Sequence, residues 1–458
     1  MTANRYLEGP FAPVNEEVTA HDLPVTGRIP AGLNGRYLRN GPNPLGHVDP
    51  ATHHWMLGEG MVHGVRLRDG RAAWYRNRWV RAASVAEKLG EPRRGRPLQG
   101  DMDFATNTHV IGHAGRTFAL MESGPPPYEL TDELDTIGPS DFGGTLPAGF
   151  TAHPKLDPRT GELHAIAYLP GGDHVQHLVV DATGKVIRAT SIPAAGHGMM
   201  HDFSLTERHV IVYDLPLTFS MEALGAGQAV PYVFRRDRPA RIGIMPRAGG
   251  EVRWREAEPC WIAHTLNAYD DGSSVIIDLV RYPGWFDASE HRAAIPVFDR
   301  WTLDLASDKV HERRLDDRPQ EFPRVNEGVV SRPHRYGYTA VMGALIASMA
   351  PLGAKLPGEA FTNALLKHDL VRGTSEIHSF GRDAAVGEGV FAPSASSTSS
   401  AEAAEDDGYV MAYVHNPDRG AADLVILAAQ DFTGEPVARI HLPTRIPLGF
   451  HGSWIPDA

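Results

Sequence analysis

The sequence predicts an all-β protein, a propeller built from small antiparallel sheets. Strand-turn-strand patterns run along the whole chain, and the clearest is residues 66–75, where the Asp69-Gly70 turn separates two strand-like segments. The same pattern returns at residues 179–187, at residues 406–414 and around Gly434. Repeated hairpins without long helices between them are typical of propellers. Seven blades of about 65 residues each would fill the 458 residues as one domain, residues 1–458.

Helical signals are few and short, and they fall at residues 83–89 and 358–370. Long insertions interrupt the regular hairpins, and several of them are rich in turn-forming residues. We expect them to form a cap of loops and short helices over one face of the propeller, roughly at residues 215–240, 281–295 and 340–370.

Composition narrows the class of protein. A hydrophobic content of 42% allows a sizeable core, and the net charge of −12 argues against a nucleic-acid partner because no basic stripe is present to neutralise phosphates. The single cysteine, Cys260, excludes an internal disulfide and favours a reducing compartment. Charged residues interrupt the N-terminus, and glycine and proline break the longest uncharged run, residues 336–354. We therefore expect a soluble, cytoplasmic protein.

Three histidines occupy one place in three hairpins. His153 lies nine residues ahead of the strand-like segment 162–168, and His201 lies eight residues ahead of residues 209–214. His264 lies nine residues ahead of residues 273–278. If these hairpins are equivalent repeats about an axis, the three imidazoles converge on it. Several neutral imidazoles can hold a divalent transition metal without neutralising its charge, so the pattern predicts a metal site.

A fourth ligand should come from another blade. His451, in a glycine-rich and aromatic segment near the C-terminus, is the candidate, although such a histidine is more often exposed. His109 fits the hairpin pattern loosely and is the runner-up. With 23 histidines in the chain, a single histidine is more often structural than a ligand, so the prediction depends on the repeated placement.

Metal-bound imidazoles usually donate their second ring hydrogen to a carboxylate or a carbonyl, which fixes the tautomer. Three glutamates lie at or near the edges of predicted strands, where they could serve this purpose: Glu122, Glu321 and Glu388. Surface glutamates are common, and the residues alone leave a solvent-exposed role open for each.

Several stretches, together with these histidines and glutamates, resemble the carotenoid cleavage oxygenase family. That family includes bacterial apocarotenoid and stilbene oxygenases, plant epoxycarotenoid dioxygenases and the retinal pigment epithelium isomerase. The similarity covers nearly the whole chain. Its most specific motifs are residues 27–35, Arg39-Asn40-Gly41-Pro42, Gly60-Met61-Val62-His63-Gly64, Met200-His201-Asp202-Phe203, Glu321-Phe322-Pro323-Arg324 and Gly449-Phe450-His451-Gly452-Ser453-Trp454.

The resemblance implies a seven-bladed propeller with a dome over its iron-bearing face. It also implies that His153, His201, His264 and His451 bind one Fe²⁺ per chain, while His109 falls outside the ligand positions. Glu122, Glu321 and Glu388 would orient three of the four histidines and leave His153 without such a partner. The chain departs from the family pattern at Gly389, where a proline commonly follows the third glutamate, so Glu402 and Glu405 are the alternatives to Glu388.

The implied reaction is the cleavage of a carbon–carbon double bond by O₂ to give two carbonyl products. Stilbene-cleaving members place a lysine directly before the first glutamate, where this chain has Met121. A thioether fits beside a polyene better than it activates a phenol, so we expect a carotenoid or apocarotenoid substrate, with stilbenes or phenylpropenoids as the alternative.

Three further alternatives are a non-catalytic propeller scaffold, a zinc hydrolase and the isomerase branch of the family. Residues 215–234 are apolar and match a region near the tunnel mouth of relatives, so peripheral membrane contact and ordinary cap packing are both open. The oligomeric state also stays open.

Overall fold

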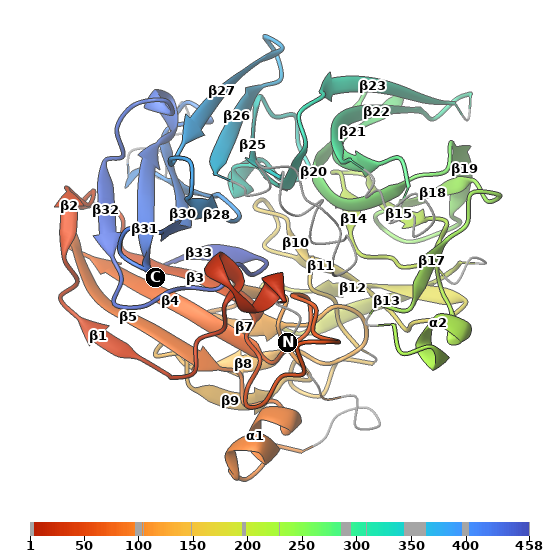
Figure 1. Ribbon diagram of the computed structural model, residues 1–458. Helices are drawn as coiled ribbons and strands as arrows, with labels where there is room; N and C mark the ends of the chain where they lie inside the picture. Colours follow the sequence, from red (N-terminus) through yellow and green to blue (C-terminus); the bar gives the residue numbers. More distant parts are fainter. Residues whose placement is uncertain are drawn as a thin grey trace.

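The computed structural model describes residues 4–96, 103, 105–147, 149–194, 198–228, 230–284, 295–307, 309–342, 363–395 and 403–457. Within this part of the chain, seven antiparallel sheets stand around a common axis like the blades of a propeller (Figure 1). The predicted all-β propeller is therefore confirmed. An additional two-stranded sheet, β16 with β17, lies outside the blades.

The blades follow one another along the chain, and each has at least four strands. The first blade contains β33 (Gly452–Pro456), β3 (Gly35–Pro42), β4 (Gly60–Arg68), β5 (Arg71–Trp79) and β1 (Thr19–His21), and the last contains β28 (Ala385–Val386), β29 (Val390–Pro393), β30 (Gly408–Asn416), β31 (Ala421–Ala428), β32 (Ala438–His441) and β2 (Val25–Gly27). The second blade contains β6 (His109–His113), β7 (Arg116–Leu120), β8 (Tyr128–Leu130) and β9 (Thr136–Pro139), the third contains β10 (Lys155–Leu156), β11 (Leu163–Tyr168), β12 (His174–Val180) and β13 (Val186–Pro193), and the fourth contains β14 (Phe203–Leu205), β15 (His209–Asp214), β18 (Ala240–Pro246) and β19 (Arg253–Ala257). The fifth blade contains β20 (Trp261–Asp271), β21 (Ser274–Tyr282), β22 (Val297–Asp304) and β23 (Val310–Asp316), and the sixth contains β24 (Gln320–Arg324), β25 (Tyr336–Val341), β26 (Ala364–Asp369) and β27 (Thr374–Ser379).

The middle strands of the blades are buried more completely than the outermost ones. All eight residues of β3 are buried, whereas β13 alternates between half-buried and exposed residues over most of its length. The hydrophobic core lies between neighbouring blades, as shown by Ile211 of β15, which belongs to the same buried cluster as Leu279 of β21. The alternating pattern that the sequence shows at a blade's rim is thus lost toward the axis, where both faces of a strand are covered.

The two ends of the chain close the ring. The N-terminal strand β2 pairs with β32 of the last blade, with Val25 opposite Ile440. The C-terminal strand β33 pairs with β3 of the first blade, with Arg39 opposite Gly452. Figure 1 shows these red and blue segments side by side. This closure holds the segment directly before β33 close to the axis.

The insertion at residues 215–240 forms a hairpin and a short helix outside the blades. Its elements are β16 (Leu217–Phe219), α2 (Met221–Gly225) and β17 (Tyr232–Phe234). Thr218 forms a β-bridge with Gly198, and the N–H of Met199 donates to the carbonyl of Leu217. The hairpin therefore packs against the segment that leads into His201. Most of the expected insertion at residues 281–295, and the central part of that at 340–370, lie outside the described residues.

One of the two helix predictions is confirmed. Helix α1 spans Ala83–Leu89 and ends at Gly90, which has the left-handed conformation that glycine adopts without strain. The prediction at 358–370 is wrong for Ala364–Asp369, which is strand β26, and residues 358–362 lie outside the described part. The first five residues of β26 are buried, so the strand lacks the alternation that separates a strand from a helix in sequence.

The remaining short elements are single turns of 3₁₀ helix. They are η1 (Arg5–Leu7), η2 (Gly9–Phe11), η3 (Glu327–Val329) and η4 (Ala429–Asp431). Among the residues that the structure describes, none of the helices is both long and apolar enough to cross a membrane.

Candidate metal centre

Each of the four predicted histidines lies at or near the first strand of its blade. His153 comes two residues before β10, His201 two residues before β14, and His451 directly before β33. His264 lies inside β20, where the pairing with β21 is irregular between Ile262 and Thr265. A bulge of this kind turns a side chain out of its regular alternation.

The structure brings the four imidazoles together at one point. Nε2 of His201 lies 3.2 Å from Nε2 of His264. Ring centroids are 4.4 Å apart for His153 and His201, 4.7 Å for His153 and His451, and 4.7 Å for His264 and His451. Nitrogen atoms of His153, His264 and His451 also lie within 4.8 Å of one another, so this group could hold a metal ion. Histidine nitrogens gathered so closely are a donor set typical of transition-metal sites.

Each of the three predicted glutamates lies against one of these histidines. Oε2 of Glu122 is 2.8 Å from Nδ1 of His201, and Oε2 of Glu321 is 2.7 Å from Nδ1 of His264. Oε1 of Glu388 is 2.9 Å from Nδ1 of His451. With Nδ1 directed at a carboxylate, Nε2 of each ring is left with a lone pair for a metal.

A strained turn of the backbone positions Glu321. Its neighbour Phe322 has a φ of +52°, a left-handed conformation that is uncommon for an aromatic residue, at an irregularity in the pairing of β24 with β25. The N–H of Phe322 donates to the carboxylate of Glu321, and the Phe322 ring lies 5.3 Å from the ring of His451 and 5.8 Å from that of His264. The conformation thus places a buried carboxylate and an apolar wall beside two of the histidines.

The second oxygen of each glutamate also has a donor. Tyr168 donates its hydroxyl to Oε1 of Glu122 at 2.7 Å, and Tyr282 donates to Oε1 of Glu321 at 3.0 Å. Oε2 of Glu388 accepts from Nη1 of Arg324 at 2.9 Å and from the N–H of Gly452 at 2.8 Å.

Sequence reasoning missed these donors, although a signal for two of them exists. Tyr168 is the last residue of β11 and Tyr282 the last of β21, so each ends the second strand of a hairpin that carries a histidine. Burial raises the pKa of both phenols, and the adjacent glutamates raise it further, so the hydroxyls remain protonated donors.

The neutral state of the ring, which metal binding requires, is favoured at two of the imidazoles. Burial, reinforced by neighbouring histidines, holds the pKa of His153 and of His451 well below its usual value, so both rings are neutral at pH 7. At His201 burial acts in the same direction, but the carboxylates of Glu122, Asp202 and Glu321 together outweigh it and the pKa is raised. Among the described residues, no group forms a hydrogen bond with the buried Nε2 of His153. A buried nitrogen without a partner is costly, and a metal ion would satisfy it.

Asp202 links three of the histidine-bearing segments. This buried carboxylate lies 2.9 Å from Nζ of Lys155, two residues after His153, and accepts from the N–H of Thr265 at 2.8 Å. It also accepts from the hydroxyl of Thr265 at 3.0 Å. Because Asp202 itself follows His201, the bridge connects neighbouring blades at the height of the imidazoles.

The alternative residues are placed elsewhere. Both ring nitrogens of His109 face backbone carbonyls, at 2.7 Å from Ala152 and 3.2 Å from Gly452, so this ring has no nitrogen left for a metal. Glu405 accepts from the backbone N–H groups of Arg335 and Tyr336. Glu402 lies outside the described residues.

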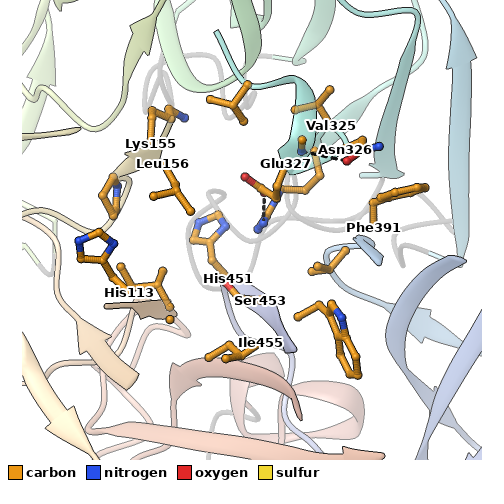
Figure 2. Close-up of a pocket in the computed structure, with 18 of the residues that line it drawn as sticks. His113, Lys155, Leu156, Val325, Asn326, Glu327, Phe391, His451, Ser453 and Ile455 are labelled. Carbon is orange, nitrogen blue, oxygen red and sulfur yellow. Dashed lines mark hydrogen bonds and ion pairs between the residues drawn. The ribbon is translucent and has the colours of Figure 1, made fainter. Parts of the chain in front are cut away.

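A cavity along the axis reaches the histidines. It has a volume of about 1210 Å³, and its lining includes His153, His264 and His451. Figure 2 shows His451 within this cavity, with Lys155 and Leu156 of β10 on one side and Val325 on another. The centre is therefore buried but connected to open space.

The fold and the site define a class: a seven-bladed propeller with four imidazoles on its axis, three of them backed by glutamate carboxylates. Residues 11–456 match the model of the retinal pigment epithelial membrane protein (RPE65) family. The chain belongs to this family, which is that of the carotenoid cleavage oxygenases.

Individual relatives cover the whole chain. A protein of Mycobacterium tuberculosis named carotenoid cleavage oxygenase is 46% identical, over 99% of this chain and 98% of that one. Isoeugenol monooxygenase of Pseudomonas nitroreducens is 32% identical, over 98% of each chain. The crystal structure of Pseudomonas brassicacearum lignostilbene dioxygenase superposes with a TM-score of 0.86 at 29% identity, over 99% of this chain and 98% of that one. The chain is accordingly an enzyme, an oxidoreductase that incorporates oxygen into its substrate.

Proposed function

We propose that the protein is a non-haem Fe²⁺ dioxygenase that cleaves a carbon–carbon double bond of a carotenoid or apocarotenoid into two carbonyl products. The observation that carries this proposal is the meeting of four imidazoles from four blades, three of them in contact with a glutamate carboxylate. The relative at 46% identity, named carotenoid cleavage oxygenase, supports the choice of substrate.

In this proposal His153, His201, His264 and His451 hold one Fe²⁺ ion. Bound iron would supply a site at which dioxygen is activated beside the alkene. The protein's part is to present neutral nitrogen donors and to keep their orientation fixed. Glu321 and Glu388 hold the Nδ1 protons of His264 and His451 by hydrogen bonds of 2.7 and 2.9 Å, and Glu122 lies 2.8 Å from Nδ1 of His201.

Metal content tests the proposed centre. Protein prepared anaerobically should contain one iron per chain, and replacing His264 with alanine should remove it. A protein free of metal would favour the non-catalytic scaffold, and zinc in place of iron would favour a hydrolase.

Labelled oxygen tests the proposed reaction. With an apocarotenal and ¹⁸O₂, both new carbonyl groups should carry the label when products are analysed before exchange with water. Products without label would refute the dioxygenase proposal.

The residue before Glu122 supports a polyene substrate. Met121 lies with its sulfur 3.9 Å from the hydroxyl of Thr108, which in turn accepts from the N–H of Glu122 at 3.3 Å. Trp261 is buried, with its ring centroid 6.2 Å from that of His201. A thioether and an indole ring suit a conjugated apolar chain, because both are polarisable and neither ionises at pH 7.

A second candidate function is the cleavage of stilbenes or phenylpropenoids. It is favoured by the similarity to the isoeugenol and lignostilbene enzymes. Turnover of a panel that contains apocarotenals, resveratrol and isoeugenol distinguishes the two, because faster turnover of the phenols would reverse the preference.

We also propose that the enzyme is cytoplasmic and contacts membranes only at their surface, through the cap hairpin. On helix α2 the side chains of Met221 and Leu224 are 71% and 47% exposed, and the guanidinium of Arg236 lies 5.9 Å from the ring of Phe234. Exposed apolar groups with nearby cations suit an interface with anionic lipids. The wild-type protein should float with anionic liposomes, and the variant with Met221 and Leu224 changed to serine should not. If the variant floats as well as the wild type, the proposed membrane contact is refuted.

A further inference from the structure

His451 lies at the end of a segment without regular secondary structure. The structure describes all of residues 442–451, and between β32 and β33 they form no helix or strand. Strand β33 begins directly after His451 and fixes the chain on that side. On the other side the backbone is held only by tertiary contacts, because no ladder of hydrogen bonds supports it. These contacts therefore decide how precisely the imidazole is placed.

The beginning of the chain supplies several of these contacts. Residues 4–14, which we call the N-terminal strap, contain the turns η1 and η2 at the red end of the ribbon in Figure 1. Arg445 donates from Nη1 to the carbonyl of Ala12 at 3.2 Å and from Nη2 to the carbonyl of Pro13 at 3.1 Å. Its guanidinium thus connects the strap to the segment that leads into His451.

Backbone hydrogen bonds connect the same segment to the strap and to the first blade. The N–H of Leu448 donates to the carbonyl of Pro10, in the strap, at 2.7 Å. The N–H of Phe450 donates to the carbonyl of Asn40, in β3, at 3.1 Å. The strap is therefore a direct backbone partner of the chain three residues before His451.

A row of aromatic rings leads from the strap to the imidazole. Ring centroids are 6.0 Å apart for Phe11 and Trp55, 4.9 Å for Trp55 and Phe450, and 6.5 Å for Phe450 and His451. Phe11 and Trp55 belong to one buried cluster with Tyr6 of the strap, and Phe450 packs against it. Aromatic pairs at such distances attract each other beyond the effect of buried area, so the row stabilises the contact.

The strap is itself fixed at both ends. Asn4 donates from Nδ2 to the carbonyls of Pro50 and His53, at 2.9 Å each. At the other end the side chain of Asn43 accepts from the N–H of Val14 at 2.9 Å and donates to its carbonyl at 2.8 Å. Both anchors lie in the connection between β3 and β4. The strap therefore has a fixed position relative to the first blade.

We propose that the N-terminal strap positions His451 for metal binding, and that Arg445 is the residue that connects the strap to the ligand segment. The inference rests on the proposed function, in which His451 is a metal ligand. Arg445 is a positioning residue, because it acts through the backbone six residues before the histidine. When this connection is lost, the ring of His451 moves away from the other three imidazoles for part of the time, and the metal is bound less tightly.

Metal affinity tests the positioning role. Metal-free protein is titrated with Fe²⁺ under anaerobic conditions, in competition with a chelator. Arg445→Met should weaken binding about 3- to 10-fold, which is less than the loss of a direct partner of a ligand would cause. Arg445→Lys keeps a cation that can donate to either carbonyl, and it should recover part of the affinity.

Arg188→Met is the matched control. Arg188 is half-buried like Arg445, and it donates to two backbone carbonyls, that of Arg247 at 2.7 Å and that of Ala248 at 3.4 Å. These contacts connect the third and fourth blades away from His451, so the affinity for Fe²⁺ should be unchanged. Wild-type affinity in Arg445→Met, or an equal loss in Arg188→Met, would overturn the proposal.

Hydrogen exchange of the metal-free protein separates this inference from the proposed function. Arg445→Met and Asn4→Ala should each speed the exchange of residues 445–451 several-fold relative to the wild type, whereas Arg188→Met should not. If the wild type binds no Fe²⁺ at the four histidines, the proposed function fails and the inference fails with it. If the wild type binds Fe²⁺ but exchange in Arg445→Met is unchanged, only the inference fails.

Discussion

Asp202 bridges the segments that carry three of the histidines, and its replacement by asparagine is the most informative change in the structure. The carboxylate is 1% exposed, lies 2.9 Å from Nζ of Lys155 and accepts two hydrogen bonds from Thr265. Asparagine has the same shape but only one acceptor oxygen. Either Lys155 or Thr265 must then face an N–H₂ group, and the ion pair is lost in both cases.

The expected cost follows from burial. Removing one partner of a buried ion pair costs about 3–5 kcal/mol. Lys155 is 21% exposed and can regain some water, so we expect a value of about 3 kcal/mol. For a chain of this length that corresponds to a fall in melting temperature of roughly 3 °C. Because the bridge fixes ligand segments from outside the metal, affinity for iron should also fall, by about 10- to 100-fold.

The assay combines thermal unfolding of the metal-free protein with iron affinity measured by competition with a chelator. Asp278→Asn is the matched control, since Asp278 is 0% exposed and accepts two hydrogen bonds of 2.7 Å from Arg300. Asp278 is opposite Asn267 of β20, and its partner His334 also contacts Asn267, so the control perturbs the blade of His264 without touching Asp202. We expect a similar loss of stability in the control with no change in iron affinity.

Two results would refute the reasoning. One is an iron affinity of the Asp202→Asn protein equal to that of the wild type. The other is an equal loss of affinity in the Asp278→Asn control, which would show that general destabilisation, and not the bridge, weakens the site.

Tyr282→Phe leaves Oε1 of Glu321 without its 3.0 Å donor, so the affinity for iron should fall by up to about 10-fold. The control is Tyr213→Phe, which removes the hydroxyl of another buried tyrosine, bonded to Ser204, and should leave the affinity for iron unchanged. Burial lowers the pKa of His177 to about 3, so below pH 6.5 the unfolded chain takes up a proton that the folded one does not, and stability falls as the pH drops. His177→Leu should therefore reduce the pH dependence of unfolding between pH 6.5 and 4 by up to about 1.4 kcal/mol per pH unit, and an unchanged slope would contradict the shift. Met121→Lys should raise the ratio of stilbene to apocarotenal turnover at least 10-fold, as product analysis on a mixed substrate panel would show; a constant ratio would remove residue 121 from substrate choice.

Local patterns predict most of the blades because hairpins carry their own signals. Residues 209–214 are a strand in both the prediction and the structure, and the Asp69-Gly70 turn joins β4 to β5. The closure of the ring has no such signal, since β2 pairs with β32 across more than 400 residues and depends on the finished propeller. The error at β26 has a related cause, because burial on both faces removes the alternation.

At the site, the informative signal was that a histidine recurs at the same place, eight or nine residues ahead of a strand, in three hairpins. It singled out His153, His201 and His264, and the structure brings these together with His451, although their role as ligands remains our proposal. Contacts that depend on tertiary packing could not be predicted. Neither the bridge at Asp202 nor the left-handed conformation of Phe322 follows from the type of residue, because each arises where two blades meet or a strand bulges.

The balance of buried charge indicates which ion the centre suits. The three glutamates that contact the imidazoles carry three negative charges. Arg324, which binds Glu388, also pairs with Glu327 at 2.6 Å, so these two charges cancel, and the buried Arg39 near Glu388 returns one positive charge. Tyr168 and Tyr282 are neutral, and Lys155 cancels Asp202. Two negative charges are then left beside four imidazoles, and a divalent cation compensates both, whereas a trivalent one would leave an excess positive charge in a buried site. The protein surroundings, apart from the four imidazoles, therefore suit a divalent ion at the proposed site.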